Sequence, residues 1–381
     1  MRILHVGKYF PPVRGGLETI LESVLELTAG SVENLVVAAD RSSTRRVKRW
    51  PGCEVHLLRS LGEFLHTPIV PSMPFVLGRF LRRGVDVLAL HFPNPMAAVA
   101  YLIARPFRGD EKLVVFYHSE VDFSGGISRI VAKAYYLFER IFLSRADRIV
   151  VSNPPMRDSS PQIPRYRGKT AIVHYALKEG WTELADDQLR EMSRIRKAHG
   201  DRMVLFVGRL VSYKGLDTLL DAAGTIRGKI VLVGDGPLRR YLAGRIVGER
   251  LVDKVSLETS VQDTKPYFAA CALLVLPSIS RLETFGIVQI EAMAFGKPSV
   301  SSNLPTGVTY INVDGETGLT FPVGDAGSLS NAVNRLLDDG DLRSRLGENA
   351  RRKVLEHYSP ESVKLSLLDL YGDLCAYRIP R

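Results

Sequence analysis

The feature that most constrains the fold is an alternation of short apolar runs with stretches of helical periodicity, repeated along the 381 residues. The runs are rich in Val, Ile and Leu, and the intervals between them leave room for crossover helices. Such a pattern is typical of buried parallel strands in a doubly wound sheet. In the first half we expect strands at residues 1–6, 35–38, 85–91, 113–118, 148–151 and 170–173.

A polar, charged segment at residues 179–200, which we expect to be helical, interrupts the alternation, which then starts again. The second series of expected strands covers residues 203–207, 230–233, 255–257, 273–276, 299–301 and 318–321. This restart indicates a second domain of the same class. The sequence therefore predicts an α/β protein of two Rossmann-like domains, each a doubly wound parallel sheet, facing a central cleft. We place the domains at residues 1–177 and 178–357, and expect a final helix within residues 358–381 to cross back to the N-terminal domain.

The net positive charge of the chain comes almost entirely from its first half. Residues 1–175 hold 24 Lys and Arg against 15 Asp and Glu, whereas residues 176–381 hold 27 against 26. This excess predicts an anionic partner for the N-terminal domain. A membrane surface suits it better than nucleic acid, because no nucleic-acid-binding motif is present. A solvated face that only aids solubility would give the same charge count.

The sequence gives no sign of a membrane span or a metal site. No apolar run approaches the roughly 18 residues that a span needs. The first strand pattern begins at Met1, so we expect no secretory signal. The three cysteines, Cys53, Cys271 and Cys375, lack metal-ligand spacing, which favours a reducing, cytoplasmic compartment and no bound metal.

Two cations follow the expected strand at residues 203–207. Arg209 and Lys214 stand between this strand and a helix that starts after Gly215. Cations at the carboxyl end of a strand, next to a helix N-terminus, suit a diphosphate. Two unrelated surface cations are the alternative. In the first half, Gly15 and Gly16 precede a helix and could let backbone N–H groups approach an anion, or form a plain turn.

Two carboxylates follow the expected strand at residues 273–276. Glu283 falls in a polar loop, and Glu291 falls in a helix expected from Gly286 to Ala294. A carboxylate among apolar helix residues is costly unless it is bound. Glu291 is therefore a candidate to hold the hydroxyls of a ribose, with a structural salt bridge as the alternative.

Together these motifs resemble a known family. Glu283 and Glu291 fit the E-x7-E motif of the retaining GT-B glycosyltransferases of family 4, and the segment around them, PSISRLETFGIVQIEAMAFGKPSV, is similar over its full width. Gly208-Arg209 with Lys214-Gly215 is similar to the phosphate clamp of that family, and PPVRGGLE, VLVGDGP and DGETGLTFPVGD also match. The resemblance is tight over residues 203–326 and loose over residues 40–110.

The resemblance implies a role for particular residues. His118 would lie near the reacting carbon and the acceptor, although a strand-end histidine with a satisfied hydrogen bond is the plain alternative. Glu283 would contact the transferred sugar, while Arg209 and Lys214 would bind the diphosphate. The remaining nucleotide-sugar contacts would come from Gly15, Gly16, Val261 near the base, Thr284, the backbone of Phe285, Gly286 and Ile287, and Glu291 at the ribose.

The resemblance also implies a retaining, metal-independent hexosyltransferase without a cofactor. The donor would be a nucleoside-diphosphate sugar, GDP-mannose-like or UDP-linked, and the acceptor a membrane-proximal glycolipid, oligosaccharide or polysaccharide in bacterial polysaccharide or lipopolysaccharide assembly. A nucleotide-sugar epimerase of the same architecture and a non-catalytic nucleotide-sugar-binding protein stay open. An epimerase would turn over the donor with no acceptor present.

One segment of the N-terminal half suits an anionic membrane surface. Residues 64–83 mix apolar residues with Arg79, Arg82 and Arg83, and follow the basic run at residues 45–49. This composition predicts an interfacial patch at the inner face of the cytoplasmic membrane. Ordinary core residues next to a solvated edge are the alternative.

Overall fold

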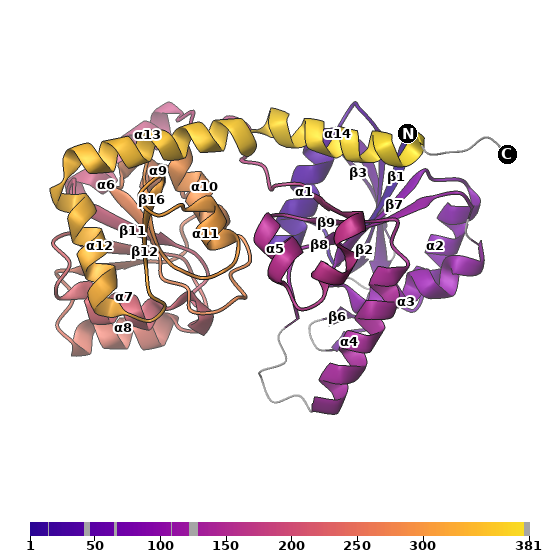
Figure 1. Cartoon of the computed structure of the whole chain (residues 1–381), viewed down its shortest axis with the longest axis horizontal. Helices are drawn as coiled ribbons and strands as arrows, with labels where there is room; N and C mark the ends of the chain where they lie inside the picture. The colour runs from indigo at the N-terminus through magenta and orange to yellow at the C-terminus, as the bar shows by residue number, and fades with distance from the viewer. Residues whose placement is uncertain (14, 42–45, 65–66, 108, 122–128, 377–381) are drawn as a thin grey trace. The chain divides into compact units, whose positions relative to one another are not determined.

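The chain divides into two compact units. The structure, a computed structural model, describes residues 1–376 except 14, 42–45, 65–66, 108 and 122–128 (Figure 1). Unit 1 consists of Met1–Ala176 together with Pro360–Arg381, and unit 2 consists of Leu177–Ser359. Arg14 and Arg45, which belong to two of the sequence patterns above, lie outside the described residues.

Unit 1 is built on an eight-stranded sheet with the order β10-β9-β8-β7-β1-β2-β4-β3. Neighbouring strands are parallel except β3 and β4, which are antiparallel. The chain reverses its direction of winding at β1, which has β2 on one side and β7 on the other. The strands are β1 (Arg2–Val6), β2 (Glu33–Asp40), β3 (Arg46–Trp50), β4 (Cys53–Arg59), β7 (Val87–Phe92), β8 (Lys112–Tyr117), β9 (Arg148–Val151) and β10 (Thr170–Ile172).

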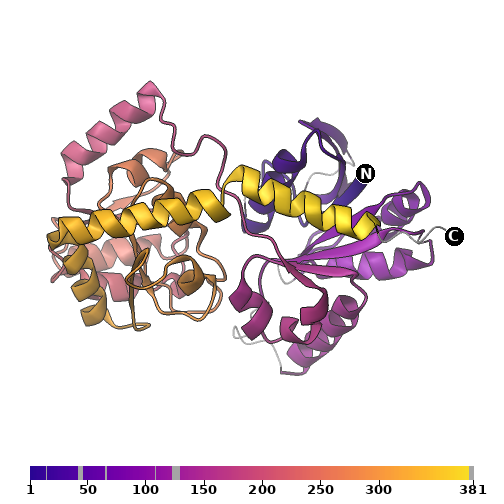
Figure 2. The same cartoon turned by 45° about the horizontal axis from the view of Figure 1, so that its top comes forward.

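Helices cover both faces of this sheet. One face packs through Leu88 and Leu90 against Leu77, Tyr101 and Phe142 of α2, α3 and α4. The other face packs against α1 and α14, and Figure 2 shows α14 in yellow lying along unit 1. These elements are α1 (Gly16–Thr28), α2 (Met73–Arg82), α3 (Pro95–Ala104), α4 (Arg129–Ser144), α5 (Pro154–Ser159), α14 (Pro360–Ala376), the 3₁₀ turns Arg105–Phe107 and Ile163–Lys169, and the small hairpin of β5 (Glu63–Phe64) and β6 (Thr67–Pro68).

Unit 2 is built on six parallel strands with the order β13-β12-β11-β14-β15-β16. These are β11 (Met203–Val207), β12 (Lys229–Val233), β13 (Val255–Glu258), β14 (Leu273–Leu276), β15 (Ser299–Ser302) and β16 (Gly318–Phe321). The helices are α6 (Asp186–His199), α7 (Leu216–Ala223), α8 (Arg239–Gly248), α9 (Lys265–Ala270), α10 (Ile287–Ala294), α11 (Gly307–Ile311), α12 (Ala326–Asp338) and α13 (Gly340–His357), with a 3₁₀ turn at Ser212–Lys214. Two doubly wound sheets confirm the predicted fold class.

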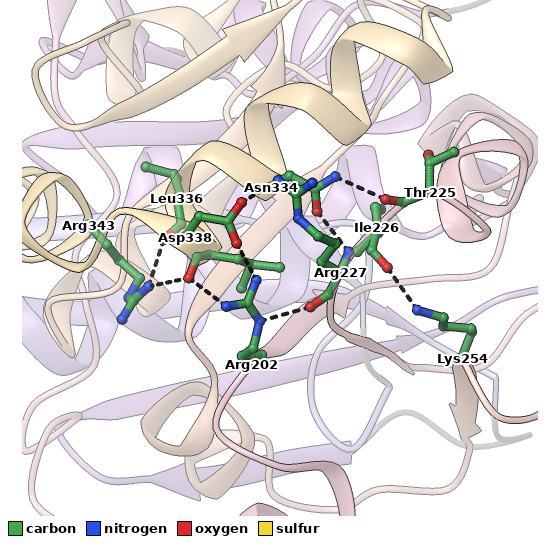
Figure 3. A network of polar contacts seen from close by, with 10 residues as sticks. Arg202, Thr225, Ile226, Arg227, Lys254, Asn334, Leu336, Asp338 and Arg343 are labelled. Carbon is green, nitrogen blue, oxygen red and sulfur yellow. Dashed lines mark hydrogen bonds and ion pairs between the residues drawn. The ribbon is translucent and has the colours of Figure 1, made fainter.

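A polar network fastens the amino-terminal end of the unit 2 sheet, away from the carboxyl ends of its strands (Figure 3). Asn334 of α12 accepts from the backbone N–H of Arg227 at 2.7 Å and donates to the carbonyl of Thr225 at 2.9 Å. Asp338 accepts from Arg202 at 2.6 Å and also pairs with Arg227. The loop that enters β12 is thus tied to the end of α12.

Several sequence expectations need correction. The helix expected within residues 179–200 begins only at Asp186. The final helix, expected within residues 358–381, begins at Pro360, because Tyr358 is fully buried in unit 2 against Phe285. Strands β3 to β6 were not expected. Strand β3 has a mostly exposed burial pattern, so it lacks the apolar alternation that marks a strand.

The expected interfacial patch at residues 64–83 belongs largely to the core. Val76, Leu77 and Phe80 of α2 are buried in the main core cluster of unit 1. Among the residues of this range that the structure describes, which exclude 65 and 66, only Phe64, Ile69 and Phe75 remain as exposed large apolar side chains. The apolar face of α2 therefore packs against protein, while Phe75 on its first turn is exposed, as are Phe64 of β5 and Ile69 before the helix.

Candidate active site

Unit 2 has a topological switch point between β11 and β14. From β11 the chain winds outward through β12 and β13, and then returns to β14 on the other side of β11. The loops after β11 and β14 therefore leave the same edge of the sheet side by side, which is where open α/β sheets bind ligands. Arg209 and Lys214 belong to the first loop, and Ser278 and Glu283 belong to the second.

Lys214 and Glu283, predicted separately, form a buried ion pair. The Lys214 Nζ lies 2.5 Å from Glu283 Oε2, and both side chains are about nine-tenths buried. The hydroxyl of Ser278 donates to the same carboxylate oxygen at 2.8 Å. The backbone carbonyl of Glu283 accepts from the Thr306 hydroxyl at 2.7 Å. The carboxylate is thus held in one orientation, and its Oε1 makes no hydrogen bond with the described residues.

Close backbone packing brings the two loops together. Gly215, which follows Lys214, has a positive φ of 66°, and a Cβ built there would lie 1.9 Å from the carbonyl oxygen of Pro277. Only glycine allows both this conformation and this approach. Ser278 was not among the predicted site residues, and Gly215 was noted only as part of the clamp motif. A polar residue directly after a strand end is a signal that could have identified Ser278.

Arg209 differs from Lys214 in that its guanidinium is exposed. It makes no ion pair with any side chain that the structure describes. An exposed guanidinium at the carboxyl edge of a parallel sheet can bind an anion in a bidentate manner. The clamp therefore combines one buried, already paired cation with one exposed cation.

Helix α10 starts beside Glu283. Gly286, with φ 79°, is its N-cap, and Ile287 is its first residue, so the backbone N–H groups at this end lack intrahelical acceptors. Thr284 accepts from Gly307 N through its carbonyl at 2.9 Å, and Phe285 is buried against Tyr358.

Glu291 lies in the second turn of α10 and is partly buried. Burial raises the pKa of its carboxyl to about 7, and the positive charge of Lys178 opposes this shift. The carboxylate makes no hydrogen bond or ion pair with the described residues, so the salt bridge considered as an alternative is not formed among them. The backbone carbonyl of Glu291 accepts from Trp181 Nε1 at 3.1 Å.

Val261 lies farther along the same edge of the unit 2 sheet. It follows the edge strand β13 and lines a cavity of about 390 Å³ with Ser260, Gln188 and Tyr267. Strands β12 and β11 separate this cavity from the Lys214–Glu283 pair. Val261 and Glu283 therefore both follow strand ends at the carboxyl edge of the unit 2 sheet.

The remaining predicted residues belong to unit 1. Gly15 is the N-cap of α1 and Gly16 is its first residue, in the connection that follows β1. Gly15 has an extended φ of −171°, which any residue can adopt, but a Cβ there would lie 2.3 Å from a carboxylate oxygen of Glu18. Because the end of the Glu18 side chain can move aside, neither this contact nor the backbone conformation requires glycine at position 15.

His118 directly follows β8 and is buried. Its Nε2 lies 3.0 Å from His91 Nδ1, and its Nδ1 lies 3.0 Å from the hydroxyl of Tyr175. Burial lowers the pKa of His118 to about 3, so its ring is neutral near pH 7. Both ring nitrogens are engaged within unit 1, which makes His118 a poor general acid or base. A role near the acceptor stays a prediction.

Solved glycosyltransferase structures share this architecture. The crystal structure of Anabaena Alr3699/HepE in complex with UDP matches with a TM-score of 0.77 at 18% identity, covering 98% of this chain and 100% of that one. The apo form of the lipopolysaccharide outer core galactosyltransferase WaaB matches with a TM-score of 0.71 at 16% identity, covering 98% and 99%. Two Rossmann-like units with this topology define the chain as a GT-B protein.

Sequence relatives place the chain more narrowly. The pattern of the family "Glycosyl transferases group 1" matches residues 187–353, and that of the "Glycosyl transferase 4-like domain" matches residues 15–176. O-antigen chain mannosyltransferase C of Escherichia coli is 31% identical, covering 98% of this chain and 99% of its own length. The D-rhamnosyltransferase WbpZ of Pseudomonas aeruginosa is 31% identical over 94% and 92%. The chain belongs to the group 1 glycosyl transferases and is a glycosyltransferase.

Proposed function

We propose that this protein transfers a hexose of the mannose type from a nucleoside-diphosphate sugar to a glycolipid or oligosaccharide acceptor in the assembly of an O-antigen-type polysaccharide. The observation that carries the proposal is the buried Lys214–Glu283 pair beside the exposed Arg209 at the switch point of unit 2. Two relatives are named as a mannosyltransferase and a D-rhamnosyltransferase, and D-rhamnose is 6-deoxymannose. A structural neighbour binds UDP, so both GDP- and UDP-linked sugars enter the test.

Charge development on the leaving group explains the arrangement of the cations. Breaking the sugar–phosphate bond leaves negative charge on the diphosphate and positive character on the sugar ring. Arg209 and Lys214 would stabilise the diphosphate, in the role that a divalent metal fills in other enzymes. Because Lys214 has three N–H donors and gives one to Glu283, it can still donate to phosphate oxygens. We accordingly propose a metal-independent transfer that retains the anomeric configuration.

Glu283 would orient the sugar. Lys214 and Ser278 both bind its Oε2, so Oε1 can accept from a sugar hydroxyl. The ion pair fixes the carboxylate before the donor binds, and this preorganisation limits the entropy lost on the way to the transition state. Glu291 would hold the ribose, and Val261 would lie at the base.

The test is transfer from a panel of GDP- and UDP-linked hexoses to a lipid-linked oligosaccharide, with wild type and two variants. Glu283→Ala and Lys214→Ala should each lower kcat about 10²- to 10³-fold, the usual effect of removing one transition-state contact. The surface substitutions Glu356→Ala and Lys197→Ala are matched controls, because both side chains are exposed. Near wild-type turnover of Glu283→Ala would contradict the assignment.

Three further readouts separate the competing functions. Addition of a chelator should leave the rate unchanged, and the anomeric coupling of the product, measured by NMR, should match that of the donor. Consumption of the donor without any acceptor would instead indicate an epimerase. Binding without release of a nucleoside diphosphate under any acceptor would indicate a non-catalytic protein.

Membrane attachment through unit 1 completes the proposal. No described helix is long and apolar enough to cross a bilayer. The outer face of α4 carries Ile130, Leu137 and Ile141 at helical spacing, with exposures of 79%, 57% and 46%. The exposed cations Lys133 and Arg140 lie between them in the sequence. An apolar stripe flanked by cations suits the interface of an anionic bilayer.

Flotation with vesicles tests this attachment. Wild type should float with vesicles rich in phosphatidylglycerol, less at high salt, and little with phosphatidylcholine alone. Replacing Leu137 and Ile141 by Ser should reduce flotation, whereas the control pair Val247→Ser and Val252→Ser, exposed in unit 2, should not. Equal flotation with neutral and anionic vesicles would refute an electrostatic attachment.

A further inference from the structure

A line of polar side chains crosses the buried face of the unit 1 sheet that α1 and α14 cover. His5 of β1 lies 3.2 Å through Nδ1 from His91 Nε2 of the neighbouring strand β7. His91 Nδ1 in turn lies 3.0 Å from His118 Nε2 after β8, and His118 Nδ1 lies 3.0 Å from Tyr175 Oη. The three imidazoles are at most 5% exposed. Polar rings in such a place are stabilised only when their nitrogens are hydrogen-bonded.

The hydrogen bonds of Thr28 and Asn34, at the end of the line beyond His5, determine which atom donates in every hydrogen bond along it. Thr28 donates its hydroxyl proton to the carbonyl of Val24 at 2.7 Å, and so accepts from Asn34 Nδ2 at 2.9 Å. The other atom of the Asn34 amide, Oδ1, faces His5 Nε2 at 3.2 Å and can only accept. His5 must therefore carry its proton on Nε2.

This assignment propagates along the line. A neutral imidazole has one donor and one acceptor nitrogen. Since His5 Nδ1 is an acceptor, His91 must donate from Nε2, and His118 must then donate from Nε2 to His91 Nδ1. The last acceptor, His118 Nδ1, receives the hydroxyl proton of Tyr175. All three histidines are thus fixed in the Nε2–H form.

Stacking fixes the ring planes as well. The ring of His91 is nearly parallel to those of Phe116 and His118, with interplanar angles of 7° and 11°, and the Phe116 and His118 rings also stack on each other at 6.3 Å. Tyr175 stands two residues before unit 2 begins at Leu177. The line therefore connects the interior of the sheet to the last residues of unit 1.

We propose that His91 and Tyr175 are positioning residues that lock His118 as a neutral imidazole with one tautomer and one ring orientation, so that His118 shapes the acceptor side of the site without transferring a proton. The kinetic part of this inference rests on the proposed glycosyl transfer. The tautomers do not, because they follow from the hydrogen bonds of unit 1 alone.

Nitrogen-15 NMR of histidine-labelled wild type tests the lock directly. His5, His91 and His118 should each show the Nε2–H tautomer at neutral pH, with imidazole N–H protons protected from exchange. Tyr175→Phe removes only one hydroxyl and should shift the His118 Nδ1 resonance. An Nδ1–H tautomer or an imidazolium at His118 would overturn the proposal.

Kinetics then distinguishes positioning from plain stability. A small displacement of a group at the site can lower kcat by about 100-fold. We expect Tyr175→Phe and His91→Phe to lower kcat at least tenfold, within that range, while the binding of nucleoside diphosphates, followed by thermal shift, stays unchanged. The matched control Tyr166→Phe loses a hydroxyl bonded to the Arg140 carbonyl, outside the line, and should keep wild-type kcat.

Each outcome has a separate meaning. Wild-type kcat in both Tyr175→Phe and His91→Phe would reduce the line to a structural feature and refute the positioning role. If His91→Phe fails to fold, the isosteric Tyr175→Phe variant still decides. Absence of sugar transfer by wild type would refute the proposed function. The NMR experiment would still test the tautomers of the three histidines, because it does not depend on that function.

Discussion

At the residue scale, Glu283 and Glu291 are eight positions apart in the sequence and occupy different surroundings. Glu283 has a cationic partner and a hydroxyl donor within hydrogen-bond distance. Glu291 has a raised pKa because burial disfavours its charge and no described residue pairs with it. One carboxylate is thus already compensated in the free protein, while the other is available to a ligand.

The uncompensated carboxylate makes a prediction about stability. The carboxyl of Glu291 ionises near 4.5 when unfolded and near 7 when folded, so the folded state loses stability as the pH rises between these values and no further above them. Glu291→Gln should therefore gain on the order of 2 kcal/mol over wild type at about pH 8 and nothing at about pH 4. Urea unfolding across this range measures the gain. The exposed control Glu356→Gln should show no such trend.

Gly215 gives a second prediction at this scale. Gly215→Ala should lose at least about 2 kcal/mol, because alanine is strained at a positive φ and its Cβ meets Pro277. Sugar transfer should fall as well, since the loops that carry Lys214 and Glu283 would be forced apart. Gly224→Ala is the matched control: its φ is −61° and its Cβ meets nothing within 4 Å. It should be neutral or more stable by up to about 1 kcal/mol, and equal stability of the two variants would disprove the argument.

At the element scale, the candidate site and the main polar network of unit 2 lie at opposite ends of its sheet. The carboxyl ends of β11 and β14 carry the candidate site, whereas the network of Figure 3 ties the amino end to α12. The Asn334 side chain hydrogen-bonds two backbone groups in the loop that enters β12. Without Asn334 these two groups would lose their partner.

Removing this anchor should destabilise unit 2 without changing its site. Asn334→Ala leaves the N–H of Arg227 and the carbonyl of Thr225 without their partner, at a cost of about 1–3 kcal/mol. Asn349, which makes a solvent-exposed hydrogen bond to the Glu316 carbonyl, is the matched control, and Asn349→Ala should cost at most about 0.5 kcal/mol. Denaturant unfolding compares the two, and kcat of the folded Asn334→Ala protein should match wild type.

Sequence patterns predicted the elements whose burial is regular. Strands such as β7, β8, β11 and β14 are nearly continuous apolar runs because both of their faces are covered, so their existence followed from the sequence pattern. Strand β3 was not predicted because its charged residues lie at an exposed sheet edge. Pairings between distant residues could not be predicted for another reason. The sequence around Lys214 does not indicate that Glu283, 69 residues later, is its partner. His5 and His91 were likewise overlooked as single polar residues inside apolar strands.

At the scale of the whole molecule, unit 1 is completed by a segment from the far end of the chain. Val363, Leu367 and Tyr371 of α14 pack with Ile3 and Val24 in one core cluster. Unit 2 lies entirely between the two segments of unit 1 in the sequence. The stability of unit 1 therefore depends on residues that follow unit 2.

Substitutions in α14 should destabilise unit 1 selectively. Leu367 is fully buried, and Leu367→Ala should cost about 2–5 kcal/mol. Leu365, 52% exposed on the same helix, is the matched control, and Leu365→Ala should cost at most about 0.5 kcal/mol. Calorimetry with a nucleoside diphosphate assigns the transitions, because a ligand of unit 2 raises only the melting temperature of that unit. Loss of stability in the ligand-sensitive transition would contradict the assignment of α14 to unit 1.

The position of α14 also sets an order of events during synthesis. The ribosome produces the strands of unit 1 first, but the helix that covers one face of their sheet emerges only after all of unit 2. At about 5–20 residues per second, that face stays open for roughly ten seconds or longer. Unit 2 can fold as soon as it emerges, whereas unit 1 must wait with apolar surface exposed to chaperones. The N-terminal unit is thus the first to be started and the last to be finished.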